Sequence, residues 1–289
     1  MDLRPDGSTV VPETDSTVIV AVQNRVERID LNSDTREVLA RIDDRNGSVR
    51  TNDGKCDPAG RLWLGRWLLP GHREPEHSTA STRPEYRPAH RTSPGPAGQN
   101  TSGPTAWYAA GQTREPASGT TTQNPPEPAV PNGILRTSAP LIPSVKLDSV
   151  TISNGIVWSA DRRTMYYVDT PTRRVTLPLR RLHGGDRLRG DSGANPRRDR
   201  LSDGMTIDRC GNLWIALWGG YGVGCWNPHS GELPHRIFVP CPNAASCAFG
   251  GENLDTLYIT TAGGTPDSRL RQGYPLSGSL LSANRAYMV

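Results

Sequence analysis

The sequence predicts an all-β protein built from a repeated unit of about 45 residues. Two observations lead to this prediction. First, Thr17–Val22 is rich in β-branched residues, and residues 24–31 alternate polar with apolar side chains, which is typical of a half-buried strand. Second, four segments share one pattern: an acidic or glycine-containing turn, a leucine or methionine, an aromatic residue and an aliphatic run. These segments are Asp57–Leu64, Asp161–Val168, Asp208–Ile215 and Asn253–Ile259.

The spacing of the aromatic residues in this pattern predicts the architecture. Tyr166, Trp214 and Tyr258 lie 48 and 44 residues apart. A period of roughly 40–50 residues with a few short strands in each unit is typical of a β-propeller. The interval from Trp63 to Tyr166 is 103 residues, and it falls to about one unit once an insertion is removed. Each unit would be a small sheet that buries its faces only against the neighbouring sheets.

A change in composition divides the chain into three parts. Residues 66–143 hold 14 of the 26 prolines, interleaved with Ser, Thr, Gly and Gln, and show no sustained period. Such a composition cannot bury enough apolar area to offset the entropy that is lost on ordering. We therefore expect a disordered insertion at 66–143, between the first propeller blades in residues 1–65 and the remaining blades in residues 144–289.

Composition also excludes several classes of partner. The formal net charge of +4 is small, and the arginine-rich residues 180–200 also contain aspartates, so no basic face for nucleic acid is expected. No apolar run approaches the ~20 residues that span a bilayer. Met1–Asp6 lacks the apolar stretch of a signal peptide, and the five cysteines contain no C-x-x-C pair. We expect a cytoplasmic protein with neither a nucleic-acid nor a membrane partner.

Polar residues followed by glycine recur upstream of the aromatic positions, in Asn52-Asp53-Gly54, Asn154-Gly155 and Asp203-Gly204. Equivalent positions of successive blades converge on the central axis of a propeller. Carboxylate and amide oxygens gathered there would suit a hard divalent cation. Asn-Gly and Asp-Gly pairs also make tight turns, so the residues alone leave both interpretations open.

Several longer motifs resemble one known family. Arg50–Arg61 resembles the R-x-N-D-G-K-x-D-P-x-G-R signature of the regucalcin (senescence marker protein)/gluconolactonase/luciferin-regenerating-enzyme-like family. Further segments resemble later motifs of that family in the same order, namely Ile152–Ser159, Tyr166–Thr170, Ser202–Trp214, Cys247–Gly251 and Leu257–Thr260.

The resemblance implies a six-bladed β-propeller with one divalent cation, calcium or zinc, on its axis. It further implies a hydrolase of small sugar lactones. Asn154 and Asp203 match metal ligands of the family, and Arg50 and Asn52 match its substrate-contacting residues. Asp203 would also be the catalytic general base. In this mechanism the cation polarises the lactone carbonyl and lowers the pKa of the attacking water, and the carboxylate takes the water's proton.

The chain departs from the family pattern at two places. The remaining metal ligand of the family is a glutamate in an early G-E-[GS]-P-x-W segment, which this sequence lacks. Without residues 66–143 about 210 residues remain, whereas six blades need about 270. We therefore expect an incomplete propeller of about five blades. The alternative function is a catalytically impaired or non-catalytic propeller that acts as a calcium-binding or interaction scaffold.

Overall fold

A computed structural model of the chain describes residues 7–42, 49–68, 106–110, 144–148, 150–172, 174–177, 190–192, 201–264 and 269–284, which form five antiparallel sheets. The strands of the first two sheets are β1 (Gly7–Pro12), β2 (Thr17–Val22), β3 (Arg25–Asp30), β4 (Arg36–Arg41), β5 (Val49–Cys56), β6 (Leu62–Leu68), β7 (Ala106–Ala110) and β8 (Ser144–Asp148). Those of the other three are β9 (Ser153–Trp158), β10 (Met165–Asp169), β11 (Arg174–Leu177), β12 (Gly190–Ser192), β13 (Leu201–Ile207), β14 (Leu213–Trp218), β15 (Gly222–Trp226), β16 (His235–Phe238), β17 (Ala244–Gly250), β18 (Thr256–Thr261) and β19 (Leu280–Asn284). A 3₁₀ turn, η1 (Thr170–Thr172), and a short helix, α1 (Arg269–Gly273), are the helical elements of the described residues.

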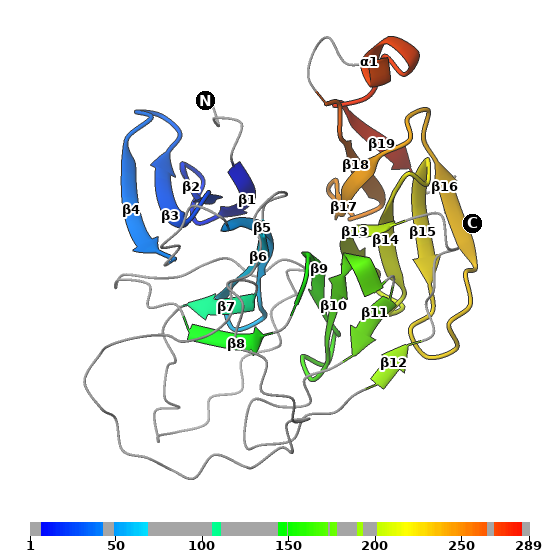
Figure 1. Cartoon of the computed structure of the whole chain (residues 1–289), viewed down its shortest axis with the longest axis horizontal. Coiled ribbons are helices and arrows are strands. Elements are labelled where there is room, and N and C mark those ends of the chain that lie inside the picture. Colours follow the sequence, from blue (N-terminus) through cyan, green and yellow to red (C-terminus); the bar gives the residue numbers. More distant parts are fainter. Residues whose placement is uncertain are drawn as a thin grey trace, which may run out of the picture.

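Each sheet is a meander in which consecutive strands pair with one another. The first strands of the sheets pack against one another in chain order, β1 on β5, β5 on β9, β9 on β13 and β13 on β17. In Figure 1 the five sheets follow one another around an arc, with β1–β4 and β17–β19 at its two ends. The predicted all-β class is confirmed, and the first strands form the inner layer of the arrangement.

Two short parts of residues 66–143, which the composition predicts to be a disordered insertion, belong to a sheet, and the three-part division of the chain stays a prediction. β6 continues through residues 66–68, and β7 lies between β6 and β8. Tyr108 pairs with Leu64 and Trp107 with Gly65. Aromatic residues favour strands, and this five-residue strand is hidden by the proline-rich composition around it. The other residues of 66–143 lie outside the described residues, and so does the predicted disorder.

The repeated acidic turn has a structural role in two of the sheets. Asp57 accepts hydrogen bonds from the backbone N–H of Ala59 and Arg61, both at 2.9 Å, and from the Trp63 indole at 3.0 Å. Asp208 and Trp214 repeat this arrangement, with the indole Nε1 donating to Asp208 Oδ2 at 3.0 Å. One carboxylate therefore closes the turn and also fixes the aromatic ring of the second strand. This explains why the aspartate and the tryptophan are six positions apart in both of these sheets.

The core is divided among the spaces between neighbouring sheets. Buried aliphatic and aromatic side chains of one sheet pack on those of the next, as in the cluster of Trp214, Ile237, Leu257 and Ile259.

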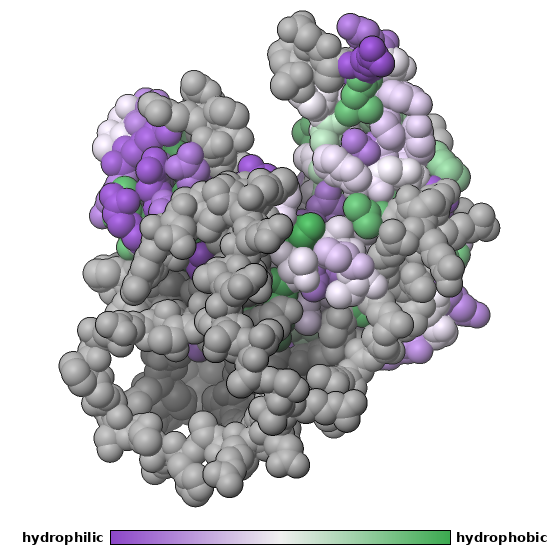
Figure 2. Space-filling model, viewed as in Figure 1, coloured by the Kyte–Doolittle hydropathy of each residue, from purple (hydrophilic) through white to green (hydrophobic). Residues whose placement is uncertain are grey.

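Figure 2 shows a mostly hydrophilic surface over β2–β4. Four of the five cysteines are buried free thiols, and Cys210 is exposed. Among the described residues, no helix has the length and apolar character that crossing a membrane requires.

Candidate functional site

An irregularity in the inner strands brings the predicted site residues to equivalent places. Each of the five inner strands holds one residue more than its partner at a β-bulge near its start. Asn52, Asn154 and Asp203 each directly follow a buried serine or threonine at this bulge. The Asn-Gly and Asp-Gly pairs therefore lie inside strands, and their interpretation as tight turns is wrong. Bulges re-aim side chains and are enriched near active sites.

The glycines after two of these residues allow neighbouring inner strands to approach closely. A Cβ on Gly155 would lie 2.7 Å from the carbonyl oxygen of Asp203, and one on Gly204 would lie 2.3 Å from Ser246 Oγ. Any side chain at these positions would push the strands apart. The glycines therefore serve the packing of one sheet on the next.

A chain of hydrogen bonds connects three inner strands. Asn52 Nδ2 donates to Asn154 Oδ1 at 2.8 Å, and Asn154 Nδ2 donates to Thr170 Oγ1 at 2.7 Å. Thr170 in turn donates to the carbonyl oxygen of Ser202 at 2.9 Å, directly before Asp203. The Thr170 hydroxyl donates its proton to the Ser202 carbonyl oxygen, so the hydroxyl oxygen must accept from Asn154 Nδ2. This fixes which side of the Asn154 amide is nitrogen and which is oxygen. The Asn154 oxygen is turned toward Asn52 and keeps one lone pair for another partner.

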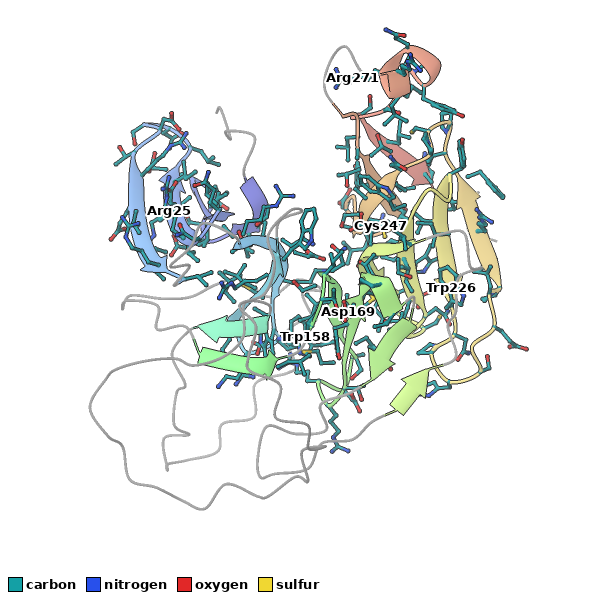
Figure 3. The ribbon with its side chains drawn as sticks, in the orientation of Figure 1. Arg25, Trp158, Asp169, Trp226, Cys247 and Arg271 are labelled. Carbon is teal, nitrogen blue, oxygen red and sulfur yellow. The ribbon has the colours of Figure 1, made fainter. Side chains whose placement is uncertain are left out.

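Two further residues that the sequence did not single out hold this network in place. Asp169 accepts hydrogen bonds from the backbone N–H of Thr151 and Ile152, at 3.1 and 2.9 Å, and so fixes the entry to β9. Asp169 is labelled in Figure 3. Thr170 follows it and makes the link to Ser202 described above. The family-like segment that ends in Asp169-Thr170 is the signal that could have identified both residues.

Charged groups gather beside Asp203. Asp203 is half-buried, and the loss of hydration, together with the negative charge of Asp53, raises its pKa to about 8. Burial also raises the pKa of Asp53, and the Lys55 ammonium opposes this rise. Burial lowers the pKa of Lys55, whose Nζ donates to the carbonyl oxygen of Met205 at 3.0 Å. The carboxylates of Asp53 and Asp203 thus lie near one another, and the Lys55 ammonium links β5 to β13.

Arg50, the fourth predicted residue, lies at the start of β5. It pairs directly with Trp67 on β6, and the guanidinium carbon lies 4.9 Å from the centre of the Trp67 ring. The backbone of Trp67 also forms a bridge to Ile152, two residues before Asn154. Arg50 is therefore one strand away from the entry to β9, at the same end of the inner strands as Asn52 and Asn154.

The donor set is suited to a hard cation. Asp203 and Asp53 supply carboxylate oxygens, and Asn154 supplies an oriented amide oxygen, all of which calcium prefers. A divalent cation would also offset the burial and the negative charge of Asp53 that raise the pKa of Asp203. Within the described ranges, no cluster of three or more His, Cys, Asp or Glu side chains suitable for a metal ion is present. The residues therefore fit a cation held by two carboxylates and amide oxygens better than a zinc site of nitrogen and sulfur ligands.

Comparison with known sequences identifies the family. The family model described as the SMP-30/Gluconolactonase/LRE-like region matches residues 1–94 and 109–263. The chain belongs to the SMP-30/gluconolactonase/LRE-like family. A Bacillus subtilis relative, YvrE, which is named provisionally as a sugar lactone lactonase, is 32% identical over 259 residues, covering 88% of this chain and 68% of the relative. Regucalcin of Xenopus laevis is 27% identical over 278 residues, covering 96% of this chain and 75% of that protein.

Solved structures of the same family share the fold. Regucalcin from Agrobacterium tumefaciens, described as a calcium-binding protein, superposes with a TM-score of 0.68 at 20% identity, covering 96% of this chain and 76% of that one. Luciferin-regenerating enzyme superposes with a TM-score of 0.66 at 22% identity, with the same coverage. The predicted family resemblance is confirmed, and these likenesses extend over nearly all of the chain.

Proposed function

We propose that this protein is a metal-dependent hydrolase of sugar lactones, with its site at the bulges of β5, β9 and β13. The observation that carries the proposal is the continuous hydrogen-bond chain from Asn52 through Asn154 and Thr170 to the residue before Asp203. Membership of a family that includes named lactonases, among them the pentonolactonase XacC of Haloferax volcanii, supports the same reaction class.

The residues would divide the work as follows. Asn154 and Asp203 would hold one divalent cation, and Asp53 would add a second carboxylate near it. When bound, the cation would polarise the lactone carbonyl and lower the pKa of water. Asp203 would accept the proton of the attacking water as general base. Arg50 and Asn52 would contact and orient the substrate. Oxygen ligands favour calcium over zinc as the cation.

The finer architecture belongs to the same proposal. The five described sheets correspond to five blades of the six-bladed arrangement that the family resemblance implies, and the sixth blade and its glutamate ligand are not among the described residues. A propeller that binds calcium without turnover is the alternative, and the absence of a third acidic ligand from the described residues favours it. The cytoplasmic location stays a prediction.

Lactone hydrolysis with and without a chelator tests the proposal. We expect turnover of sugar lactones that EDTA abolishes and calcium restores, and we expect Asp203→Asn to remove it while the protein stays folded. Asp161→Asn, at an exposed turn, is the matched control and should retain full activity. Turnover that survives both the chelator and the Asp203 substitution would rule out the metal mechanism. Calcium binding without turnover of any lactone would favour the scaffold alternative.

A further inference from the structure

The Arg50–Trp67 pair has a feature that the proposed mechanism leaves unused. Arg50 Nε is buried and has no hydrogen-bond partner. Among the residues that the structure describes, no group forms a hydrogen bond or an ion pair with the Arg50 guanidinium. The guanidinium carbon lies over the Trp67 ring, 4.9 Å from its centre. A cation–π contact of this kind offsets part of the cost of the buried donor.

The contact also restricts where the guanidinium lies. Trp67 is directly opposite Arg50 in the β5–β6 pairing, so the two side chains share one face of the sheet. The guanidinium carbon lies over the indole ring, and the guanidinium has no hydrogen-bond partner among the described residues. Two parallel N–H groups on one edge of a guanidinium match the two oxygens of a carboxylate. A pre-oriented side chain loses less entropy when it binds its ligand.

The surrounding strands are tied to Arg50 and Trp67 firmly enough to keep the geometry. Ser153 Oγ donates to the carbonyl oxygen of Arg66 at 2.8 Å, and Asn52 Nδ2 donates to the carbonyl oxygen of Ser153 at 2.7 Å. The ends of β5 and β6 are therefore both attached to the start of β9, which carries Asn154. A ligand atom near Arg50 would thus have a fixed position relative to the site.

The charges nearby favour an anionic partner. The Lys55 ammonium acts on Asp53, and in the proposed function a divalent cation offsets the charge of Asp203. The positive charge of Arg50 then has no counterpart within the described part of the chain. A neutral sugar lactone leaves that charge unmatched, whereas a lactone with a carboxylate group would pair with it.

We infer that Arg50 recognises a carboxylate on the substrate and that Trp67 is the positioning residue that holds the Arg50 side chain. The protein would therefore select acidic sugar lactones over neutral ones. This inference rests on the proposed function for the reaction itself. It assigns Trp67 a role in specificity and names lactones of sugar acids with a second carboxyl group as the substrate class.

Kinetics on a matched pair of substrates tests the inference. D-glucaro-1,4-lactone and D-glucono-1,4-lactone differ only in a carboxylate in place of a hydroxymethyl group. We expect the wild-type protein, supplied with calcium, to prefer the glucarolactone by about tenfold or more in kcat/KM. Arg50→Gln should bring this preference close to one. Equal kcat/KM values for the two lactones in the wild-type protein would overturn the inference while leaving lactone hydrolysis intact.

Variants of Trp67 separate positioning from a structural role. Trp67→Leu should reduce the preference by about threefold through KM of the glucarolactone, a smaller loss than in Arg50→Gln, and Trp67→Phe should restore most of it because a ring face remains. Trp218→Leu is the control, because Trp218 occupies the equivalent place on β14 but lies opposite Leu201. An equal loss of preference in Trp67→Leu and Trp218→Leu would contradict the assigned role, as would failure of Trp67→Phe to rescue.

Equilibrium binding distinguishes failure of the inference from failure of the proposed function. Calorimetric titration with D-glucarate and with D-glucitol, which has hydroxymethyl groups in place of the carboxylates, needs no turnover. If neither lactone is hydrolysed but D-glucarate binds more tightly than D-glucitol and loses this advantage in Arg50→Gln, the proposed function fails and the carboxylate site stands. If the two compounds bind alike in the wild type and in the variant, the carboxylate site is refuted.

Discussion

Replacement of Gly155 by alanine probes the packing that brings the site together. The new Cβ would lie 2.7 Å from the Asp203 carbonyl oxygen and 2.9 Å from Met205 Cγ, whereas ordinary contact begins at 3.4 Å. The inner strands β9 and β13 must therefore separate by about 0.7 Å. Overpacking of this kind costs about 1–3 kcal/mol of unfolding free energy.

The same displacement should weaken cation binding. Calcium–oxygen distances span only about 2.3–2.6 Å, so a separation of the strands that carry Asn154 and Asp203 cannot be absorbed by both ligands. We expect calcium affinity to fall by about tenfold or more, together with the loss of stability. Urea denaturation and calorimetric titration with calcium measure the two effects.

A matched control isolates the steric cause. Gly273 in α1 has no atom within 4 Å of a Cβ built on it, and alanine is the better helix former. Gly273→Ala should leave both stability and calcium affinity at or above the wild-type values. If Gly155→Ala is as stable as the wild type and binds calcium equally well, the close approach of β9 and β13 does not shape the site, and the argument fails.

Three further predictions concern the supports of the site and of the fold. Asp208→Ala removes a carboxylate that accepts from two backbone N–H groups and an indole, and should lower the unfolding free energy by about 2–4 kcal/mol in urea denaturation; an unchanged value would contradict the role of the acidic turn. Thr170→Val leaves the Asn154 amide without its acceptor and should cost about 1–3 kcal/mol and weaken calcium binding; calcium affinity equal to wild type would refute the link. Hydrogen bonds from Arg28 hold the pKa of Glu13 below its usual value, so this pair stabilises the fold above about pH 4.5 and loses its contribution as the pH falls through the lowered pKa; acid denaturation of Glu13→Gln that matches the wild type would contradict this.

The sequence predicted those features that are set by local contacts. The acidic turn and its tryptophan lie six positions apart in two of the sheets, as Asp57 with Trp63 and Asp208 with Trp214, because one carboxylate bonds both the turn and the indole. The polar residues at the bulges of β5, β9 and β13 could be predicted because they recur in three of the units. Asn154 and Asp203 were placed together on this basis, and the structure puts them at equivalent positions of adjacent inner strands.

Features that depend on contacts between sheets could not be predicted. The role of the glycines in close packing depends on which strand lies opposite, so the sequence alone could not decide between tight turns and strand positions. Lys55 reaches Met205, 150 residues away in the chain, and nothing in its own segment indicates this partner. The strand Ala106–Ala110 was missed because its neighbours in sequence are proline-rich and its pairing partners belong to other segments.

The account depends most on the claim that Asn154 and Asp203 bind one cation. Anomalous diffraction from crystals soaked in manganese, a heavier substitute for calcium, measures this directly. The account predicts one strong peak within about 2.0–2.6 Å of both the Asn154 amide oxygen and an Asp203 carboxylate oxygen. A peak bound by only one of them, or no peak between β9 and β13 at saturating manganese, would contradict it.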